Sequence, residues 1–373
     1  MQEGLINAYK ESGFFPEWAS PGHRGCMVGN NSASVLVDAY VKGIKVDDLE
    51  TLYKGLIHGT ENVHPTVSST GRLGHEYYNK LGYVPYNVKI NESAARTLEY
   101  AYDDWTIYHT ALLAGNRSVA DTYKKRAANY TNVFDTNMGY ARPRYADGRW
   151  KENFNLLNTH GEGFIEGNAL NYSFYVPQDV DNMIRLMGGD KSFVSKLDSL
   201  FTMHLPAEFF AQTEDVTEEG LLGGYVHGNE PSHHVIYLYN KVGQPWKTQK
   251  YVAEVLHNLY QNAPDGICGN EDCGQMSAWF VFSSMGFYPV DPISGQYEIG
   301  SPLFPEVKMH VGNGKIFTVL APEVSAENIY IQSVKLNGQP YDKSYITHEQ
   351  IMSGATLEFV MGSQPGPVWY TNE

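Results

Sequence analysis

The chain is organised around the stretch Gly269-Asn270-Glu271-Asp272-Cys273-Gly274-Gln275-Met276-Ser277-Ala278-Trp279. Apolar residues continue to Met285 and Gly286 is a typical helix stop, so the stretch predicts a turn followed by a helix. Apolar residues nearly surround this helix, which predicts that it is buried. Carboxylates beside a buried helix are costly unless they are partnered or functional, although a helix N-terminus favours negative charge. Two interpretations of Glu271 and Asp272 stay open, a capping loop and a functional turn.

The composition of the chain bounds its class. Its 373 residues suffice for two or more domains with ample core. A formal net charge of −15 disfavours nucleic acid and anionic membrane as partners. The 27 Tyr, 16 Phe and 6 Trp, together with Asp, Glu, Asn and His, suit a polar, uncharged ligand such as a sugar, although aromatic cores are also common.

The cysteines and the N-terminus exclude several other classes. Cys26, Cys268 and Cys273 are odd in number and have neither a disulfide-framework nor a metal-binding spacing. No apolar run is long enough to span a membrane. The opening residues 1–5 lack the basic-then-apolar order of a signal peptide.

Residues 1 to about 290 have mainly helical periodicity. After Asn91, which has the chemistry of an N-cap, apolar residues recur in steps of three and four as far as Leu112. Comparable segments follow Asn30, Asp47 and Thr248, and further helices are expected at 118–130, 167–175, 179–187, 191–201 and 232–242. This pattern, with long loops rich in Gly, Pro, His and acids, fits a helical bundle or toroid whose loops build a site at one end.

The periodicity changes near Pro289. Residues 307–311 and 316–320 flank Gly312-Asn313-Gly314 and predict a hairpin. Residues 329–336 precede a tight Asn337-Gly338 turn, and 357–361 predict a last strand. We therefore expect a helical region over 1–295 and a strand-rich region over 296–373.

Two further motifs carry chemistry. Glu166 stands beside Gly167 at an expected helix start, and Asn229-Glu230 lies in an oxygen-rich turn just before His233-His234. Each acid has a simpler interpretation as a helix cap. Zinc needs three or four suitable ligands, whereas the oxygens of Asn229 and Glu230 suit calcium better.

The pair Asp103-Asp104 lies inside the helix that follows Asn91. Because Trp105 is on the apolar face, one acid should point towards that face and the other towards solvent. A solvated face is the preferred interpretation.

Glycoside hydrolysis needs two separated acids, one to protonate the leaving oxygen and one to act as base or nucleophile. Glu166 and Asp272 are far apart in sequence and each lies on a glycine-rich loop. Sequence spacing alone does not show that they meet.

Most of the chain resembles glycoside hydrolase family 92, the calcium-dependent, inverting exo-α-mannosidases. The motifs occur in the family's order, and besides the opening stretch they are Gly25-Cys26-Met27-Val28-Gly29-Asn30, Leu81-Gly82-Tyr83-Val84-Pro85, Thr97-Leu98-Glu99-Tyr100-Ala101-Tyr102-Asp103-Asp104, Glu166-Gly167-Asn168-Ala169, Gly228-Asn229-Glu230-Pro231-Ser232-His233-His234 and Gly243-Gln244-Pro245-Trp246-Lys247-Thr248-Gln249. The resemblance implies a mainly α fold, an (α/α)6 toroid that is incomplete at its N-terminus, with a small C-terminal β region. It also implies removal of terminal α-linked mannose from glycans such as N-glycans.

The resemblance assigns roles to particular residues. Glu166 is expected to be the general acid, with a raised pKa, and Asp272 the general base that acts on water. Their carboxyl groups should then lie about 6.5–9.5 Å apart, as in inverting enzymes. Ca2+ at Asn229 and Glu230 is expected to grip the 2- and 3-hydroxyls of mannose. The residues expected to contact the sugar are His227, His233, His234, Asn270 and Glu271, where Asn270 replaces a frequent family Asp and is suited to orient water.

Two departures from the family pattern concern specificity and completeness. Family members selective for α-1,2 linkages often carry an acid where this chain has Gly228, so the linkage preference stays open. Members also have an N-terminal β-sandwich and a helical linker before the barrel, so this chain is expected to begin inside the barrel and to lack that domain. The resemblance suggests a secreted, periplasmic or cell-surface location in bacteria.

Three functions remain in competition. The first is the mannosidase, and the second is an inactive or carbohydrate-binding fragment of such an enzyme. The third, another toroid enzyme such as a polysaccharide lyase, is disfavoured because a lyase needs a Tyr or His base beside a basic residue, whereas these loops are acidic. Release of free mannose separates the first function from the second.

Overall fold

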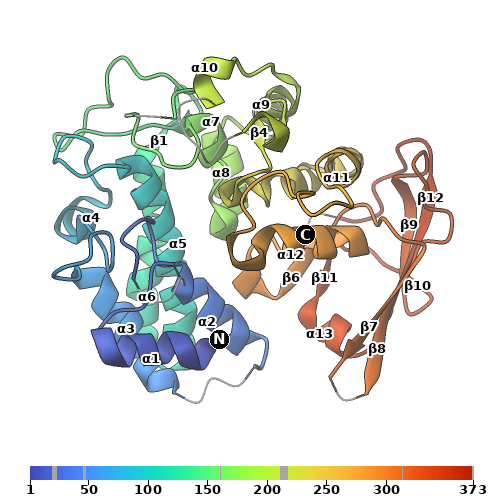
Figure 1. Ribbon diagram of the computed structural model, residues 1–373, viewed down its shortest axis with the longest axis horizontal. Coiled ribbons are helices and arrows are strands. Elements are labelled where there is room, and N and C mark those ends of the chain that lie inside the picture. The colour runs from blue at the N-terminus through green and yellow to red at the C-terminus, as the bar shows by residue number, and fades with distance from the viewer. Residues whose placement is uncertain (19–22, 45–47, 160, 211–216, 313, 372–373) are drawn as a thin grey trace. The chain divides into compact units, whose positions relative to one another are not determined.

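The computed structural model describes all residues except 19–22, 45–47, 160, 211–216, 313 and 372–373. The chain forms two compact units: unit 1 comprises residues 1–189 and 208–213, and unit 2 comprises 190–207 and 214–373. The secondary structure is mainly helical with a C-terminal β region, as predicted (Figure 1). None of the helices in the described part of the chain is long and apolar enough to cross a membrane.

Unit 1 is built mainly from helices. Its elements, including the 3-10 helices labelled η, are α1 (Gln2–Ser12), α2 (Asn31–Val41), α3 (Leu49–Glu61), α4 (His75–Leu81), α5 (Ser93–Leu113), α6 (Arg117–Arg126), η1 (Asn129–Val133), β1 (Phe134–Asp135), β2 (Tyr140–Ala141), α7 (Ala169–Tyr172), η2 (Pro177–Asp179) and α8 (Val180–Leu186). The short helix α10 (Ala207–Phe210) spans the division between the units.

Helix α5 forms the centre of unit 1. It packs against α2, α3, α6 and η1, and most of its residues are buried. The periodicity that predicted this helix is confirmed, but the expected N-cap is wrong. The helix begins at Ser93, with Glu92 as its N-cap, and the Asn91 carbonyl instead accepts a hydrogen bond from Arg96 Nε at 2.9 Å.

The expected solvated face at Asp103 and Asp104 is wrong, because both side chains are buried. Asp104 accepts hydrogen bonds from Arg72 Nη1 at 2.7 Å, Tyr78 Oη at 3.0 Å and Arg126 Nε at 3.1 Å. These partners offset the desolvation of the Asp104 charge. Asp103 Oδ2 accepts from the backbone N–H of Asn30 at 3.0 Å, which ties α5 to the start of α2.

Unit 2 combines helices with the strand-rich region. Its elements are α9 (Asp190–Thr202), η3 (Glu218–Gly220), β3 (Leu221–Leu222), β4 (Tyr225–Val226), η4 (Glu230–Ser232), η5 (Val235–Val242), α11 (Pro245–Asn258), η6 (Asp272–Gly274), α12 (Gln275–Met285), β5 (Phe287–Tyr288), η7 (Pro292–Ser294), β6 (Gln296–Ile299), β7 (Glu306–Val311), β8 (Lys315–Leu320), β9 (Tyr330–Leu336), β10 (Gln339–Pro340), β11 (Tyr345–Thr347), α13 (His348–Met352) and β12 (Thr356–Gly362).

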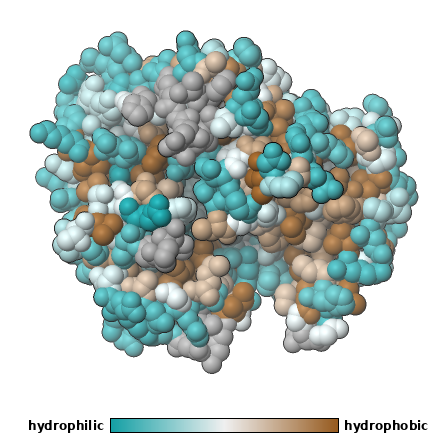
Figure 2. Space-filling view, viewed as in Figure 1, coloured by the Kyte–Doolittle hydropathy of each residue, from teal (hydrophilic) through white to brown (hydrophobic). Residues whose placement is uncertain are grey.

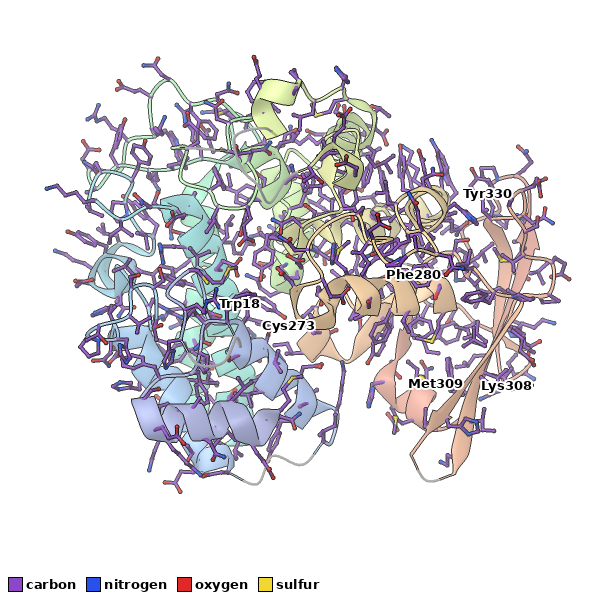
Figure 3. All side chains as sticks on the ribbon, in the orientation of Figure 1. Trp18, Cys273, Phe280, Lys308, Met309 and Tyr330 are labelled. Carbon is purple, nitrogen blue, oxygen red and sulfur yellow. The ribbon has the colours of Figure 1, made fainter. Side chains whose placement is uncertain are left out.

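The β region contains a five-stranded sheet of order β10-β9-β12-β8-β7 and a three-stranded sheet of order β11-β6-β5. The predicted hairpin is confirmed as β7 and β8, which pair antiparallel with Met309 opposite Phe317. Alternate side chains of the larger sheet, among them Phe317, Val319, Leu357 and Phe359, enter one buried cluster. This alternation is the two-residue period seen in the sequence. Figure 3 marks Lys308 and Met309 on β7 and Tyr330 at the start of β9.

Helix α12 differs from the expectation that it is buried all round. Val281 is 53% exposed, whereas Ser283 and Ser284 are buried. Figure 2 shows apolar residues at the surface in the region of α12. The apolar run therefore predicted the helix correctly but not which of its sides are covered.

Other elements were not predicted from the sequence. The two-residue strand pairs β1–β2 and β3–β4 interrupt the helical part, and the segment expected as a helix over 232–242 is largely the 3-10 helix η5. The toroid and the boundary at residue 295 stay predictions.

Candidate active site

The loop that carries Glu166 has strained backbone. Glu166 has a φ of 54° and Gly167 a φ of 156°, and Asn168 then caps α7 by accepting from the Asn171 N–H at 3.1 Å. The capping role therefore belongs to Asn168, and Glu166 lies ahead of the helix. A non-glycine residue in the left-handed region is uncommon, and such strain concentrates at functional sites.

Glu99 on α5 is a buried neighbour of this loop that the sequence analysis gave no role. Tyr172 Oη at the end of α7 donates to Glu99 Oε1 at 3.4 Å. Burial, together with the charges of Asp103 and Glu166, raises the pKa of Glu99 well above its usual range. The sequence pattern predicted only one apolar face for this helix, so the burial of Glu99 was seen only in the structure. Buried acids are rare without a function or a partner.

In unit 2, His227 uses both ring nitrogens within the protein. Its Nδ1 lies 2.9 Å from Tyr225 Oη, and its Nε2 lies 2.9 Å from Tyr260 Oη. Tyr260 donates its own proton to the Met276 carbonyl at 3.0 Å, so its oxygen must accept from His227 Nε2–H. Burial and the nearby His233 lower the pKa of His227 well below its usual value, which keeps the ring neutral.

His233 is held in the same way. Its Nε2 donates to the His227 carbonyl at 2.9 Å, so its Nδ1 accepts from Gln275 Nε2 at 3.2 Å. Burial lowers its pKa to about 4. Trp279 Nε1 donates to the His233 carbonyl at 3.1 Å, which fastens α12 to the turn. Both histidines thus fix the Asn229–Glu230 turn, and their contact with sugar, like that of the buried His234, stays a prediction.

Glycine contacts join this turn to the loop before α12. A Cβ on Gly269 would lie 2.2 Å from the Gly228 carbonyl oxygen, and a Cβ on Gly228 would lie 2.9 Å from the Cys268 carbonyl oxygen. Only glycine permits this approach of two backbones. The structure therefore brings the Asn229–Glu230 turn beside the loop that leads to Asp272.

The turn before α12 has three successive left-handed residues, with φ of 42° at Asp272, 59° at Cys273 and 101° at Gly274. Figure 3 shows Cys273 at the start of α12 and Phe280 further along it. Glu271 accepts from Ser277 N–H at 3.3 Å and from Ser277 Oγ at 3.0 Å, so this acid holds the first turn of α12. Glu271 supplies capping contacts, and Asp272 lies on strained backbone. The catalytic role expected of Asp272 and the sugar contact expected of Glu271 stay predictions.

Asn270 lies on the other side of this turn and is exposed. With Cys268 and Gly269 it lines a cavity of about 650 Å3 in unit 2. Its expected contact with sugar and its expected orientation of water stay predictions.

Comparison with known proteins identifies this arrangement. Residues 1–363 match the glycosyl hydrolase family 92 catalytic domain. The chain belongs to this family. A solved family GH92 inverting mannosidase of Bacteroides thetaiotaomicron is 44% identical, with a TM-score of 0.89 over 98% of this chain and 50% of its own. A family GH92 α-mannosidase of the same bacterium, solved with mannoimidazole, is 36% identical, with a TM-score of 0.90 over 98% of this chain and 48% of its own.

A curated relative is also described as a glycosidase. An uncharacterized secreted glycosidase of Arthroderma benhamiae is 29% identical, and the match covers 99% of this chain and 49% of that protein. The family 92 chain described here thus spans about half the length of the relatives that it matches.

The turn at Asn229 and Glu230 has a donor set that fits a hard cation. Asn229 is buried and so is Glu230 Oε1, and both supply oxygen. Within the described ranges, no three His, Cys, Asp or Glu side chains gather as a metal site. Calcium here would need backbone, water or sugar oxygens as well.

The two expected catalytic acids belong to different units, Glu166 to unit 1 and Asp272 to unit 2. The expected separation of the two carboxyl groups therefore stays a prediction.

Proposed function

We propose that this family 92 chain is the catalytic part of an inverting α-mannosidase that removes terminal α-linked mannose from glycans. The observation that carries the proposal is the strained backbone at both expected acids. Glu166, which precedes Gly167, and Asp272, which lies two residues before Gly274, each adopt a left-handed conformation, in a chain 44% identical to an inverting mannosidase. Backbone strain of this kind costs roughly 1–3 kcal/mol per residue and persists where the surrounding structure enforces it.

In the proposed reaction, Glu166 acts as general acid and gives its proton to the glycosidic oxygen as the leaving sugar departs. Asp272 acts as general base and takes a proton from the water that attacks the anomeric carbon from the opposite face. A single displacement of this kind converts the α-linked sugar into β-mannose. Glu271 and Ser277 support this step by fixing the turn that carries Asp272.

Asn229 and Glu230 would hold Ca2+ at the buried turn. The ion would supply positive charge for the 2- and 3-hydroxyls of mannose. His227 and His233 keep that turn in place through their four ring-nitrogen contacts. The secreted glycosidase among the relatives supports an extracellular or periplasmic place of action.

A second candidate function is carbohydrate binding without turnover. A protein of this kind would bind mannose and release none.

Proton NMR of the first product tests both candidates. We expect β-mannose to appear first from an α-mannoside, and the signal to vanish in Glu166→Gln and Asp272→Asn with calcium binding retained. Initial α-mannose would refute inversion. Binding of mannose with no release by the wild-type chain would establish the second candidate.

A further inference from the structure

A buried ion pair lies just upstream of Glu166 in the same loop. Lys151 Nζ is 2.7 Å from Glu162 Oε2, and the two side chains are only 11% and 8% exposed. Glu162 Oε2 has no hydrogen-bond partner within the described part of the chain, so the contact is an attraction between charges rather than an aligned hydrogen bond. Glu162 stands four residues before Glu166, so the pair acts on the backbone that leads into the strained residue.

Lys151 is itself tied to the strand pair β1–β2. Its carbonyl accepts a hydrogen bond from Arg142 Nε at 3.0 Å, and Arg142 Nη1 forms an ion pair with Asp135 Oδ2 on β1 at 2.9 Å. The Lys151 N–H donates to the Pro143 carbonyl at 2.9 Å. The ammonium group that faces Glu162 therefore belongs to a residue whose backbone is fixed.

The residue after Glu162 contacts the start of α5. The Gly163 carbonyl accepts from the N–H groups of Ala94 and Ala95, both at 3.0 Å. The first N–H groups of a helix have no partner inside it, so Gly163 satisfies two of them. A Cβ on Gly163 would lie 2.8 Å from Pro143 Cγ, so the backbone is closely packed here. A displacement of Glu162 would carry Gly163 away from its two donors.

A buried ion pair of this kind adds little to net stability. The loss of hydration of two charges offsets their attraction, and apolar residues of similar volume often replace such a pair without loss. The pair does fix a position, because separating the partners would leave an uncompensated charge in a buried place. Glu166 needs such a constraint, since a left-handed glutamate persists only where the surrounding structure enforces it.

We propose that Lys151 and Glu162 are positioning residues for Glu166: their buried ion pair holds residues 161–168 in the strained conformation from which Glu166 gives its proton to the glycosidic oxygen. The proposal rests on the role proposed for Glu166. Proton transfer needs a donor within hydrogen-bond reach of its acceptor. A loop released by loss of the pair should therefore lose this step before any other.

The double variant Lys151→Met with Glu162→Leu removes both charges and leaves apolar side chains in their place. We expect kcat for α-mannobiose to fall by about 10- to 100-fold, within the roughly 10²–10⁴-fold contribution of a general acid. An aryl α-mannoside with an acidic phenol as leaving group needs no proton from Glu166, so its kcat should change by less than about twofold. The urea midpoint of unfolding should stay the same or rise. An equal fall of kcat on both substrates would overturn the proposal.

The same substitutions at an exposed ion pair of unit 1 give the matched control. Lys54 Nζ lies 2.6 Å from Glu50 Oε1 on α3, with the two side chains 66% and 76% exposed. Glu50→Leu with Lys54→Met should leave both rates as in wild type. If this variant lost as much of the mannobiose rate as the buried pair, the effect would not belong to the loop of Glu166 and the proposal would fail.

Hydrogen exchange in the full chain tests the contact without turnover. If Gly163 moves, the Ala94 and Ala95 amides lose their acceptor, so in the Lys151→Met, Glu162→Leu variant they should exchange about tenfold faster or more. The amide of Ala101, in the middle of α5, should keep its rate. Unchanged exchange at Ala94 and Ala95 would refute the role of the pair even in an active enzyme. If the wild-type chain releases no mannose, the proposed function fails, and this measurement still decides whether the pair holds the loop.

Discussion

A Cβ on Gly269 would lie 2.2 Å from the carbonyl oxygen of Gly228 and 2.6 Å from its α-carbon. Gly228 in turn donates its N–H to the Gly220 carbonyl at 3.0 Å. Three backbone segments thus meet where no side chain fits. This contact sets the position of the Asn229–Glu230 turn relative to the loop that carries Asp272.

Gly269→Ala should therefore damage the site through sterics alone. The new methyl group must push two backbones apart, and we expect a loss of about 1–3 kcal/mol in the free energy of unfolding. It should also reduce kcat/KM by tenfold or more, because both loops move. Urea unfolding and kinetics measure the two effects.

Gly59→Ala on α3 is the matched control for this change. A Cβ at position 59 meets nothing within 4 Å, and alanine is favoured over glycine in a helix by roughly 0.5–1 kcal/mol. This variant should keep full activity with equal or higher stability. Equal behaviour of the two variants would show that the Gly228–Gly269 contact has no effect on the site.

The helices and the hairpin could be predicted because their signals are local. The three-and-four spacing gave α5, and Gly312-Asn313-Gly314 between alternating residues gave β7 and β8. The burial of Asp104 depends on its ion pair with Arg72, which is 32 residues away in sequence. A pattern along one helix does not reveal that partner, so the solvated-face interpretation was wrong.

Asp104→Asn should be strongly destabilising. It removes the charge that pairs with the buried Arg72 at 2.7 Å, and loss of one partner from a buried ion pair costs about 3–5 kcal/mol. The pKa of Arg72 is raised above its usual value, in part by Asp104. Urea unfolding followed by tryptophan fluorescence measures the loss, and a cost below about 1 kcal/mol would contradict the assignment.

Asp103→Asn should change stability in the opposite direction at neutral pH, that is, it should stabilise the fold. Burial raises the Asp103 pKa from 3.8 to about 7, so the folded chain holds a proton that the unfolded chain has lost. Between these values the free energy of unfolding falls as pH rises, by at most about 1.4 kcal/mol per pH unit.

The variant lacks this titration and should gain stability relative to wild type on going from pH 5 to pH 8. Unfolding at both pH values measures the change. Identical pH slopes for the two proteins would show that Asp103 does not titrate in this way.

Only part of the candidate site could be predicted from the sequence. The order of the motifs selected Glu166 and Asp272, each on a glycine-rich loop. The left-handed backbone at both acids was not predicted from the sequence. The sequence did not reveal that both ring nitrogens of His227 are used by Tyr225 and Tyr260, because Tyr260 is 33 residues away. Proton partners are set by tertiary packing rather than by spacing.

Removal of calcium should loosen the Asn229–Glu230 turn. We expect a chelator to lower the midpoint of thermal unfolding and calcium to restore it. A ligand that binds only the folded state adds about 2.7 kcal/mol to the free energy of unfolding when its concentration is 100 times its Kd. Calorimetric titration should show calcium binding to the wild-type chain and none to Glu230→Gln. Restoration by zinc and not by calcium would make the assignment wrong.

Substrates with different leaving groups should separate the two catalytic acids. Glu166→Gln loses the proton that the departing oxygen needs, whereas Asp272→Asn loses the activation of water. Each variant should lose several orders of magnitude in kcat on mannobiose. An aryl α-mannoside with an acidic phenol as leaving group does not need protonation, so it should restore the rate of Glu166→Gln much more than that of Asp272→Asn. Steady-state kinetics give, for each variant, the ratio of its kcat on the aryl mannoside to its kcat on mannobiose. Equal restoration in the two variants would mean that Glu166 is not the proton donor, and greater restoration in Asp272→Asn would reverse the two assignments.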